Sequence, residues 1–437
     1  MTVTDQDPGR TSSGMRHFRF LVVGNAVSAY GTYLDMIALS LFAYSLTGSA
    51  THTGLFLALR LATSVLTGFG AGSLVSRLDR KRIMVTSDIS QAVALVVLVL
   101  APTTAQAGLL YAVAVVTGAG ATLTSVALRS SIPEIVGQDQ RVRANALLAT
   151  GRSLAMVAGF ASAGVLISTV GYTGAFLIDA GAFLFSAAVL ARLPITTRSR
   201  QPAAAAGSGP GSGPGAATDT GPDSGPDEAR RPSGVLTAQL TALRYLRLTP
   251  VLLALISLRA ADAFGSASHN VGLPVLSTML DPQHPAAFMS QFWATWAIGN
   301  IIAQRAVARW ARRTGRTINE RAFAAGAALM SVAFILTFTA PPLPLAVLVA
   351  TVAGVADGFT EIAYTTRLQA TPDDQRGYVF GFSATAENLG FGVGMVACSF
   401  LLEQFTPLTV VTLFHGLAVL LAVAFLATLW ARGRTTT

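Results

Sequence analysis

Ionisable residues inside apolar segments are the first candidates for chemistry in this sequence. Asp35 and Arg60 each lie within a long, mostly apolar run. A charged side chain at bilayer depth costs about 2.5–3.5 kcal/mol on insertion scales, so it needs a partner, a watery cavity or a function. At about 1.5 Å rise per residue, their depths in adjacent antiparallel helices differ by about 6 Å. We therefore expect an ion pair, which either holds two helices together or lets Asp35 exchange a proton.

A second group of charges lies in the C-terminal half. Arg259 and Asp262, spaced i and i+3, can pair within one helix, whereas Asp357 and Glu361, spaced i and i+4, share one helical face. Two carboxylates one turn apart repel each other unless a cation or a proton intervenes. We expect Arg259 to pair with Asp357, which leaves Glu361 or Asp262 as a further proton-binding candidate. Ion pairs that only connect helices are the alternative.

His269 is a third candidate for proton exchange, because an imidazole has an unperturbed pKa of about 6.5. The alternative is a simple hydrogen bond from His269 to a carbonyl group or to Asn270. We expect no role for the remaining histidines, which lie near segment ends without metal-ligand spacing: His17, His52, His284 and His415.

The single cysteine, Cys398, excludes internal disulfides and zinc ribbons. We therefore predict no metal and no cofactor. The sequence also shows no nucleophile–base set typical of an enzyme.

The elements that position these residues are long apolar helices. The chain has 437 residues, of which 52% are hydrophobic and 12% charged, whereas a soluble protein has about 25% charged residues. We predict an all-α integral membrane protein, because windows of about 20 apolar residues can span a bilayer. We count twelve such windows, near 20–45, 53–76, 83–101, 107–128, 146–169, 173–191, 251–277, 288–309, 322–340, 345–366, 380–402 and 408–430.

Arginine placement predicts the topology. The even-numbered connections hold Arg77, Arg80, Lys81, Arg82, Arg141, Arg143, Arg312, Arg313, Arg316 and Arg376, whereas the odd-numbered connections hold no Lys or Arg. By the positive-inside rule, both termini are cytoplasmic. Because the loops account for the formal net charge of +9, we expect the lipid bilayer as a partner and no nucleic acid.

A polar insert separates two groups of six helices. Residues 203–233 are rich in Gly, Ser, Pro and Asp, a composition that cannot bury enough apolar surface to order itself. Residues 235–247 have one apolar face and suit a helix lying along the membrane surface. We predict an N-terminal bundle at 1–192, a flexible cytoplasmic linker with an amphipathic helix at 193–248, and a C-terminal bundle at 249–437.

The two halves repeat each other. An offset of 234 residues aligns Asn25, Ser28, Gly31, Thr32 and Asp35 with Arg259, Asp262, Gly265, Ser266 and His269. A second segment, at an offset of 235, aligns Arg152 with Glu387 and Gly159 with Gly394. Parallel six-helix repeats are a transporter architecture, with the substrate site between the halves near the midplane. We expect cavity residues on these polar faces, at Asn25, Ser28, Thr32, Ser266 and Asn270.

The sequence resembles the major facilitator superfamily of transporters and, more narrowly, the branch containing macrolide efflux proteins and the enterobactin exporter. The resemblance is carried by residues 18–50, 72–88 (GSLVSRLDRKRIMVTSD), 132–147 and 376–382 (RGYVFGF). It implies two pseudo-symmetric six-helix bundles and alternating access. It also implies a gating loop that contains Gly72, Arg77, Asp79, Arg80 and Asp88.

The gating loop departs from the family pattern. Ser76 stands where the family has an acid, and Asp79 stands where a later Gly is expected. In the family this loop stabilises one conformation through ion pairs, so Asp79 or Asp88 would have to supply the missing charge. The antiporter motif of the fifth helix is also altered, with Phe160 in place of Pro.

The resemblance and the buried acids together predict a secondary transporter that exports an amphiphilic small molecule in exchange for protons. No Walker phosphate-binding loop is present in the sequence. We expect a monomer in the cytoplasmic membrane of a bacterium. The alternatives are a proton-coupled uptake symporter and a membrane receptor that binds ligand without transporting it. Substrate identity, transport direction and the choice between H⁺ and Na⁺ are not determined by these patterns.

Overall fold

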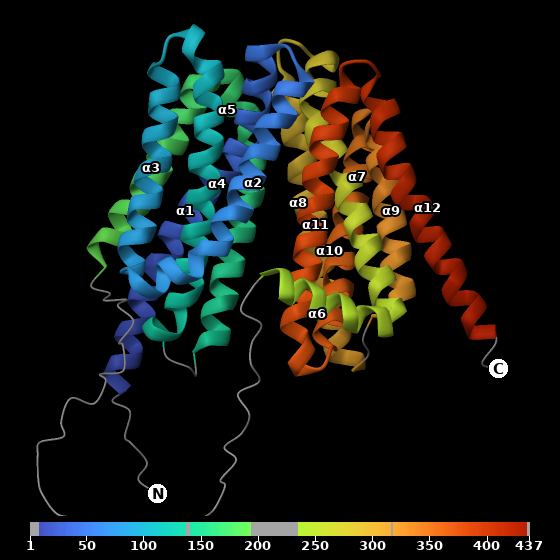
Figure 1. Cartoon of the computed structure of the whole chain (residues 1–437). Coiled ribbons are helices and arrows are strands. Elements are labelled where there is room, and N and C mark those ends of the chain that lie inside the picture. The colour runs from blue at the N-terminus through green and yellow to red at the C-terminus, as the bar shows by residue number, and fades with distance from the viewer. Residues whose placement is uncertain (1–7, 137–139, 194–234, 316–317, 435–437) are drawn as a thin grey trace, which may run out of the picture.

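A computed structural model describes residues 8–136, 140–193, 235–315 and 318–434. Within these ranges the chain is helical, as Figure 1 shows, and has the predicted all-α membrane architecture. The N-terminal bundle, or N-bundle, comprises α1 (Pro8–Thr47), α2 (Ala50–Arg77), α3 (Arg80–Leu100), α4 (Thr103–Val136) and α5 (Arg141–Arg192). The C-terminal bundle, or C-bundle, comprises α7 (Pro250–Leu280), α8 (Pro285–Thr314), α9 (Glu320–Thr337), α10 (Leu343–Gln369), α11 (Asp373–Leu402) and α12 (Pro407–Arg434).

Ten segments of the described residues are long and apolar enough to cross a membrane, compared with twelve predicted. One of the ten, Arg143–Arg192, contains two predicted spans. Its backbone leaves helical geometry at Gly171 (φ 69°, ψ −178°), a conformation open essentially to glycine only. The predicted span 288–309 lies in α8, which is not among the ten because residues such as Gln291 and Asn300 lower its mean hydropathy.

Local sequence signals set the helix ends. Ser49 and Asn319 accept hydrogen bonds from backbone N–H groups as the N-caps of α2 and α9, the role that short polar side chains favour. Pro250 and Pro285 open α7 and α8, where the missing N–H has no intrahelical acceptor in any case. Gly315 ends α8 in the left-handed conformation. Short connections therefore make successive helices run antiparallel, while the main packing partners are helices further apart in the chain, such as α1 with α5 and α7 with α11.

The helix α6 (Val235–Leu248) lies across the C-bundle, where it packs against α7 and α11 (Figure 1). Ala242 and Leu246 are buried against the bundle, whereas Arg244 and Arg247 are exposed. The Gln239 side-chain amide donates a hydrogen bond of 2.9 Å to Thr385 of α11. The predicted amphipathic segment is thus a helix anchored to one bundle. The predicted tether at 203–233 lies outside the described residues.

The hydrophobic cores show where the bundles meet. We call the end at which α1 begins and α12 ends the basic end, and the opposite end the far end. Near the basic end each bundle has its own core, with Phe18 and Ile132 in the N-bundle and Leu252 and Phe323 in the C-bundle. In the far half, two clusters combine residues of both bundles. The Phe160 ring of α5 stacks on Trp293 of α8 with 5.6 Å between centroids. The bundles therefore pack together in the far half.

Candidate functional site

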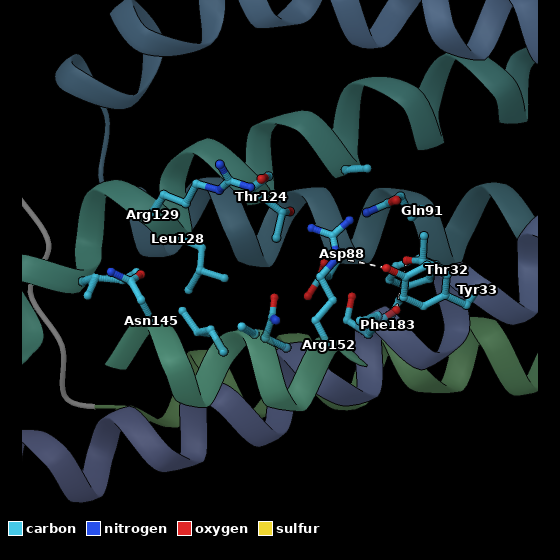
Figure 2. A pocket seen from close by; sticks show the side chains of 18 residues that line it. Thr32, Tyr33, Asp88, Gln91, Thr124, Leu128, Arg129, Asn145, Arg152 and Phe183 are labelled. Carbon is cyan, nitrogen blue, oxygen red and sulfur yellow. Dashed lines mark hydrogen bonds between the residues drawn. The ribbon is translucent and has the colours of Figure 1, made fainter. Parts of the chain in front are cut away.

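A cavity of about 500 Å³ lies within the N-bundle, between α1, α3, α4 and α5 (Figure 2). The predicted residues Asn25, Ser28 and Thr32 line it, whereas Ser266 and Asn270 of the C-bundle do not. The remaining polar or aromatic lining residues are Tyr33, Asp88, Gln91, Thr124, Ser125, Arg129, Asn145, Arg152 and Phe183. Sites for small molecules have volumes of about 300–1,000 Å³, so the cavity has a suitable size for one.

Arg152, which the repeat aligns with Glu387, contributes an exposed cation to the cavity wall. Its Nε donates a hydrogen bond of 2.9 Å to the Tyr33 hydroxyl group (Figure 2). A guanidinium has five N–H donors in a planar fork, so its terminal nitrogens can still bind an acceptor on a ligand. Arg129 is also exposed at the cavity wall. The wall therefore combines cations, amides, hydroxyl groups and aromatic rings.

Asp35 lies one turn beyond Thr32 on the same helix and is buried, with 2% exposed. Arg60 Nη1 lies 3.6 Å from Asp35 Oδ2, which agrees with the expected pairing. Asp179, from the second half of α5, is also fully buried and lies near enough to both for electrostatic interaction. Its carboxylate packs against Gly31, where a Cβ atom would overlap it. Arg60 therefore pairs directly with Asp35, while Asp179 adds a second buried carboxylate beside this pair.

Arg259 connects three acids in the C-bundle. It lies 3.5 Å from Asp262, 2.7 Å from Glu361 and 3.0 Å from Glu387. The expected pairing of Arg259 with Asp357 is not the direct contact that forms, because Glu361 and Glu387 lie closer to the guanidinium. Asp357 instead accepts a hydrogen bond of 2.7 Å from the Asn300 side-chain amide. Glu387 comes from α11 and joins the cluster through the packing of α11 against α7, which spacing along one helix does not indicate.

His269 belongs to a buried hydrogen-bonded chain that includes His415, which sequence reasoning treated as incidental. Asn270 Nδ2 lies 2.9 Å from the Ser266 carbonyl oxygen and 3.2 Å from His269 Nε2. The carbonyl accepts only, so the amide nitrogen faces it and donates its second hydrogen to His269. His269 Nδ1 then donates to His415 Nε2 at 3.1 Å. The Phe334 ring stacks on His269, with centroids 3.7 Å apart. This arrangement needs only neutral imidazoles.

The structure places the predicted gating residues at several positions between α2 and α3. Gly72 and Arg77 are exposed near the basic end of α2. Asp79 is the N-cap of α3 and accepts a hydrogen bond of 3.0 Å from the Lys81 N–H, while Arg80 Nη1 donates to the Ser130 carbonyl oxygen at 2.8 Å. Asp88 is 1% exposed and lies two turns along α3, beside the cavity. The loop therefore connects helices within the N-bundle.

Residues 21–371 match the family model of the Major Facilitator Superfamily. The chain belongs to this superfamily. Its family membership indicates a transporter rather than an enzyme, in the multi-pass membrane setting that the helices imply. No curated protein sequence matches the chain as a relative.

Solved structures with the same fold belong to transporters. A mutant of the nucleoside transporter NupG has a TM-score of 0.70 at 17% identity, over 94% of this chain and 99% of that one. A bacterial homologue of the human lysosomal transporter Spinster has a TM-score of 0.66 at 15% identity, over 97% and 96%. A bacterial homologue of the iron transporter ferroportin has a TM-score of 0.67 at 14% identity, over 94% and 98%. These likenesses concern the fold.

Proposed function

We propose that this superfamily member exports amphiphilic small molecules across the cytoplasmic membrane of a bacterium in exchange for protons. By the positive-inside rule, the basic loops favour a cytoplasmic position for both termini. The N-bundle cavity then lies toward the cytoplasmic side, where an exported substrate must bind first. Its mixture of aromatic, amide and cationic groups suits a ligand with apolar and polar parts. The macrolide-efflux resemblance of residues 18–50 and 72–88 supports the same substrate class.

The observation that carries proton coupling is the buried group formed by Asp35, Asp179 and Arg60. Two carboxylates and one guanidinium leave one negative charge in excess, and an apolar interior penalises an uncompensated charge. A proton bound by the carboxyl pair removes the excess. Thr32 connects this group to the cavity wall, because it lies one turn from Asp35 on α1. A change in packing around Asp35 can therefore change both proton and substrate binding, which is the differential affinity that coupling needs.

His269, Asp262, Asp357 and Glu361 are further candidates for proton exchange in the C-bundle. Arg259 compensates one of the acids around it, so a second proton site can form in that cluster. Because Glu361 and Glu387 are partly exposed, with side-chain exposures of 50% and 36%, they can exchange protons with water directly. The buried histidine chain lacks that access. We therefore rank the carboxylate cluster above His269.

The contacts of the far half fit a state that is open toward the cytoplasm. The Spinster and ferroportin homologues were both solved in an inward-facing state, which supports this interpretation. The physical requirement for transport is a second state in which the far half separates while the basic half closes. Rocking of two rigid bundles about a central site is the usual route in such repeat proteins.

The test is flux through purified protein in liposomes under an imposed pH gradient, with radiolabelled erythromycin and ethidium as probes. We expect wild-type protein to accumulate probe against its gradient, and Asp35→Asn to lose this accumulation while probe exchange at equal pH continues. The exposed basic-end variant Asp374→Asn is the control. Gradient-driven accumulation that persists in Asp35→Asn would remove Asp35 from coupling. Uptake in the opposite sense would favour a symporter, and probe binding without flux would favour a receptor.

A further inference from the structure

One acidic side chain at the far end crosses between the bundles. Glu403, the residue that follows α11, reaches the first turn of α2. Its Oε1 accepts a hydrogen bond of 2.6 Å from the Ser49 hydroxyl group and one of 2.9 Å from the Thr51 N–H. Ser49 also caps α2, because its side chain accepts from the His52 N–H. The contact thus joins the C-terminal end of one helix to the N-terminal end of another.

The electrostatics of the two helix ends favour this contact. A carboxylate is disfavoured at the C-terminus of its own helix and favoured at the N-terminus of a neighbouring helix. The far-end loops of the described chain contain no Lys or Arg, so α2 supplies the positive partner for Glu403. The Ser49 hydroxyl and the Thr51 N–H lower the pKa of the Glu403 carboxyl group. Its stabilisation therefore depends on the opposite bundle.

Close packing continues directly below the hydrogen bonds. Gly54 of α2 lies against Ser399 of α11, and a Cβ atom at this glycine would overlap that side chain. Ala50 is buried in a cluster with Met395 and Cys398 of α11. Separation of α2 from α11 must therefore break the Glu403 hydrogen bonds first or at the same time.

At the basic end, the sequence of α2 itself carries no acid. Ser76 stands at the position where the gating loop would carry one, and Asp79 caps its own helix α3. At the far end, Glu403 links α11 with α2. At the basic end, Ser76 replaces the expected acid. This asymmetry favours the state in which the far end is closed.

We propose that Glu403 is a latch that holds the far end closed, and that its protonation or removal shifts the molecule toward a state open at that end. The proposal rests on alternating access, but it requires no particular substrate, direction or coupling ion. Its test measures conformation, so that failure of the latch and failure of proton-driven export give different results.

The sign of the pH dependence follows from the contacts. They lower the pKa of Glu403 in the closed state only, so the latch is complete above the ordinary Glu value of about 4.3 and is lost as the pH falls through the lowered value. Other titratable groups around Glu403 are Tyr44 of α1 and His52 of α2, whose Nδ1 lies 2.7 Å from the Tyr111 hydroxyl group. His52→Gln therefore serves as the background for the pH series.

The experiment measures distances between spin labels in full-length protein in lipid nanodiscs, with Cys398→Ala as the background. One label pair, Thr104→Cys with Leu343→Cys, reports the far end, and another, Leu78→Cys with Arg313→Cys, reports the basic end. At about pH 7.5 we expect Glu403→Gln to raise the far-end-open population about 3- to 10-fold, since a hydrogen-bonded charge is lost. Wild type should approach this variant only as the pH falls well below the ordinary Glu value of about 4.3, whereas the variant should itself respond little to acid.

Two further variants keep the test decisive. Ser49→Asp preserves a good N-cap but places a carboxylate against Glu403, so it should open the far end more than Glu403→Gln does. Asp281→Asn is the matched control, because Asp281 is a far-end carboxylate whose pKa is lowered by its own loop, through the His284 and Gln283 N–H groups. Unchanged far-end distances in both Glu403→Gln and Ser49→Asp would overturn the latch. An equal shift in Asp281→Asn, or far-end opening without closure at the basic end, would also overturn it.

Discussion

The two bundles carry pairs of titratable residues at equivalent places, but the pairs differ in chemistry. An offset of 234 residues relates Asp35 to His269 and Gly31 to Gly265. In the N-bundle, Gly31 packs against the Asp179 carboxylate. In the C-bundle, Gly265 packs against His415, and a Cβ atom added at this glycine would lie 3.3 Å from His415 Nδ1. In both halves, a glycine of the first helix thus packs closely against a titratable side chain of another helix. That side chain is an acid in the N-bundle and a histidine in the C-bundle.

This difference separates a charged site from a neutral one. In the proposed mechanism, Asp35, Asp179 and Arg60 together carry one excess negative charge, and a bound proton removes it from the N-bundle site. His269 and His415 are connected by a hydrogen bond and stack against Phe334, so they require no counter-ion. In the C-bundle, the charges gather instead around Arg259, on the basic side of His269 along α7. We infer that coupling is concentrated in the N-bundle.

The largest effect that tests this comparison is expected from the shared arginines. Arg259→Gln leaves the buried Asp262 without its cation, and removal of one partner from a buried ion pair costs about 3 kcal/mol or more. Glu361 and Glu387 add little because water screens them. We expect a lower thermal unfolding midpoint for Arg259→Gln, with Arg259→Lys between it and wild type. A midpoint equal to that of wild type would show that the acids are already neutral.

A smaller but more specific effect is expected from the two equivalent pairs. Asp179→Asn removes one of the two carboxylates around Arg60, so the pH dependence of flux should shift. His415→Gln removes one imidazole hydrogen bond and should cost about 1 kcal/mol of stability with an unchanged pH profile. Flux in liposomes at a series of equal internal and external pH values measures both. A shifted profile in His415→Gln, with none in Asp179→Asn, would reverse the assignment of the charged site.

The smallest single effect is expected at Gly265, compared with its equivalent Gly31. Gly31→Ala forces a methyl group onto the Asp179 carboxylate, and overpacking of this kind costs about 1–3 kcal/mol. Gly265→Ala meets His415 Nδ1 and the Phe414 carbonyl oxygen at 3.3 and 3.4 Å, so a small local shift suffices and the cost should stay below about 1 kcal/mol. Thermal midpoints of the two variants in one detergent provide the comparison. Equal midpoints would mean that the two helix contacts are equally tolerant.

Much of the candidate site follows from spacing along single helices. Asn25, Ser28 and Thr32 share one face of α1 because the spacing matches the helical repeat, and all three line the cavity. The Asp35–Arg60 pair follows from similar depths in adjacent antiparallel helices. In contrast, Arg259 has several possible acidic partners at similar depth, and only the lateral positions of α10 and α11 select among them. Asp88 lies beside the cavity because of the lateral position of α3, which the spacing along α3 does not indicate.

His415 and Glu403 show a second limit of sequence reasoning. Both lie near segment ends, where the pattern assigns no face, and both gain their contacts from helices far away in the chain. His415 was hidden because the offsets that relate the halves pair Asp179 with Leu413 or Phe414, so the repeat does not point to His415. Glu403 is an ordinary loop acid until α2 is placed beside α11.

The sequence by itself determined that the chain is a membrane protein of repeated helices with one basic side. These properties depend on segment length, periodicity and loop charge, which the bilayer constrains locally. The tertiary structure decided which buried charges share a partner, that the cavity lies within one bundle, and that the far half is closed in this state. These features depend on the lateral packing of helices that are distant in sequence, and side-chain spacing along one helix carries no information about it.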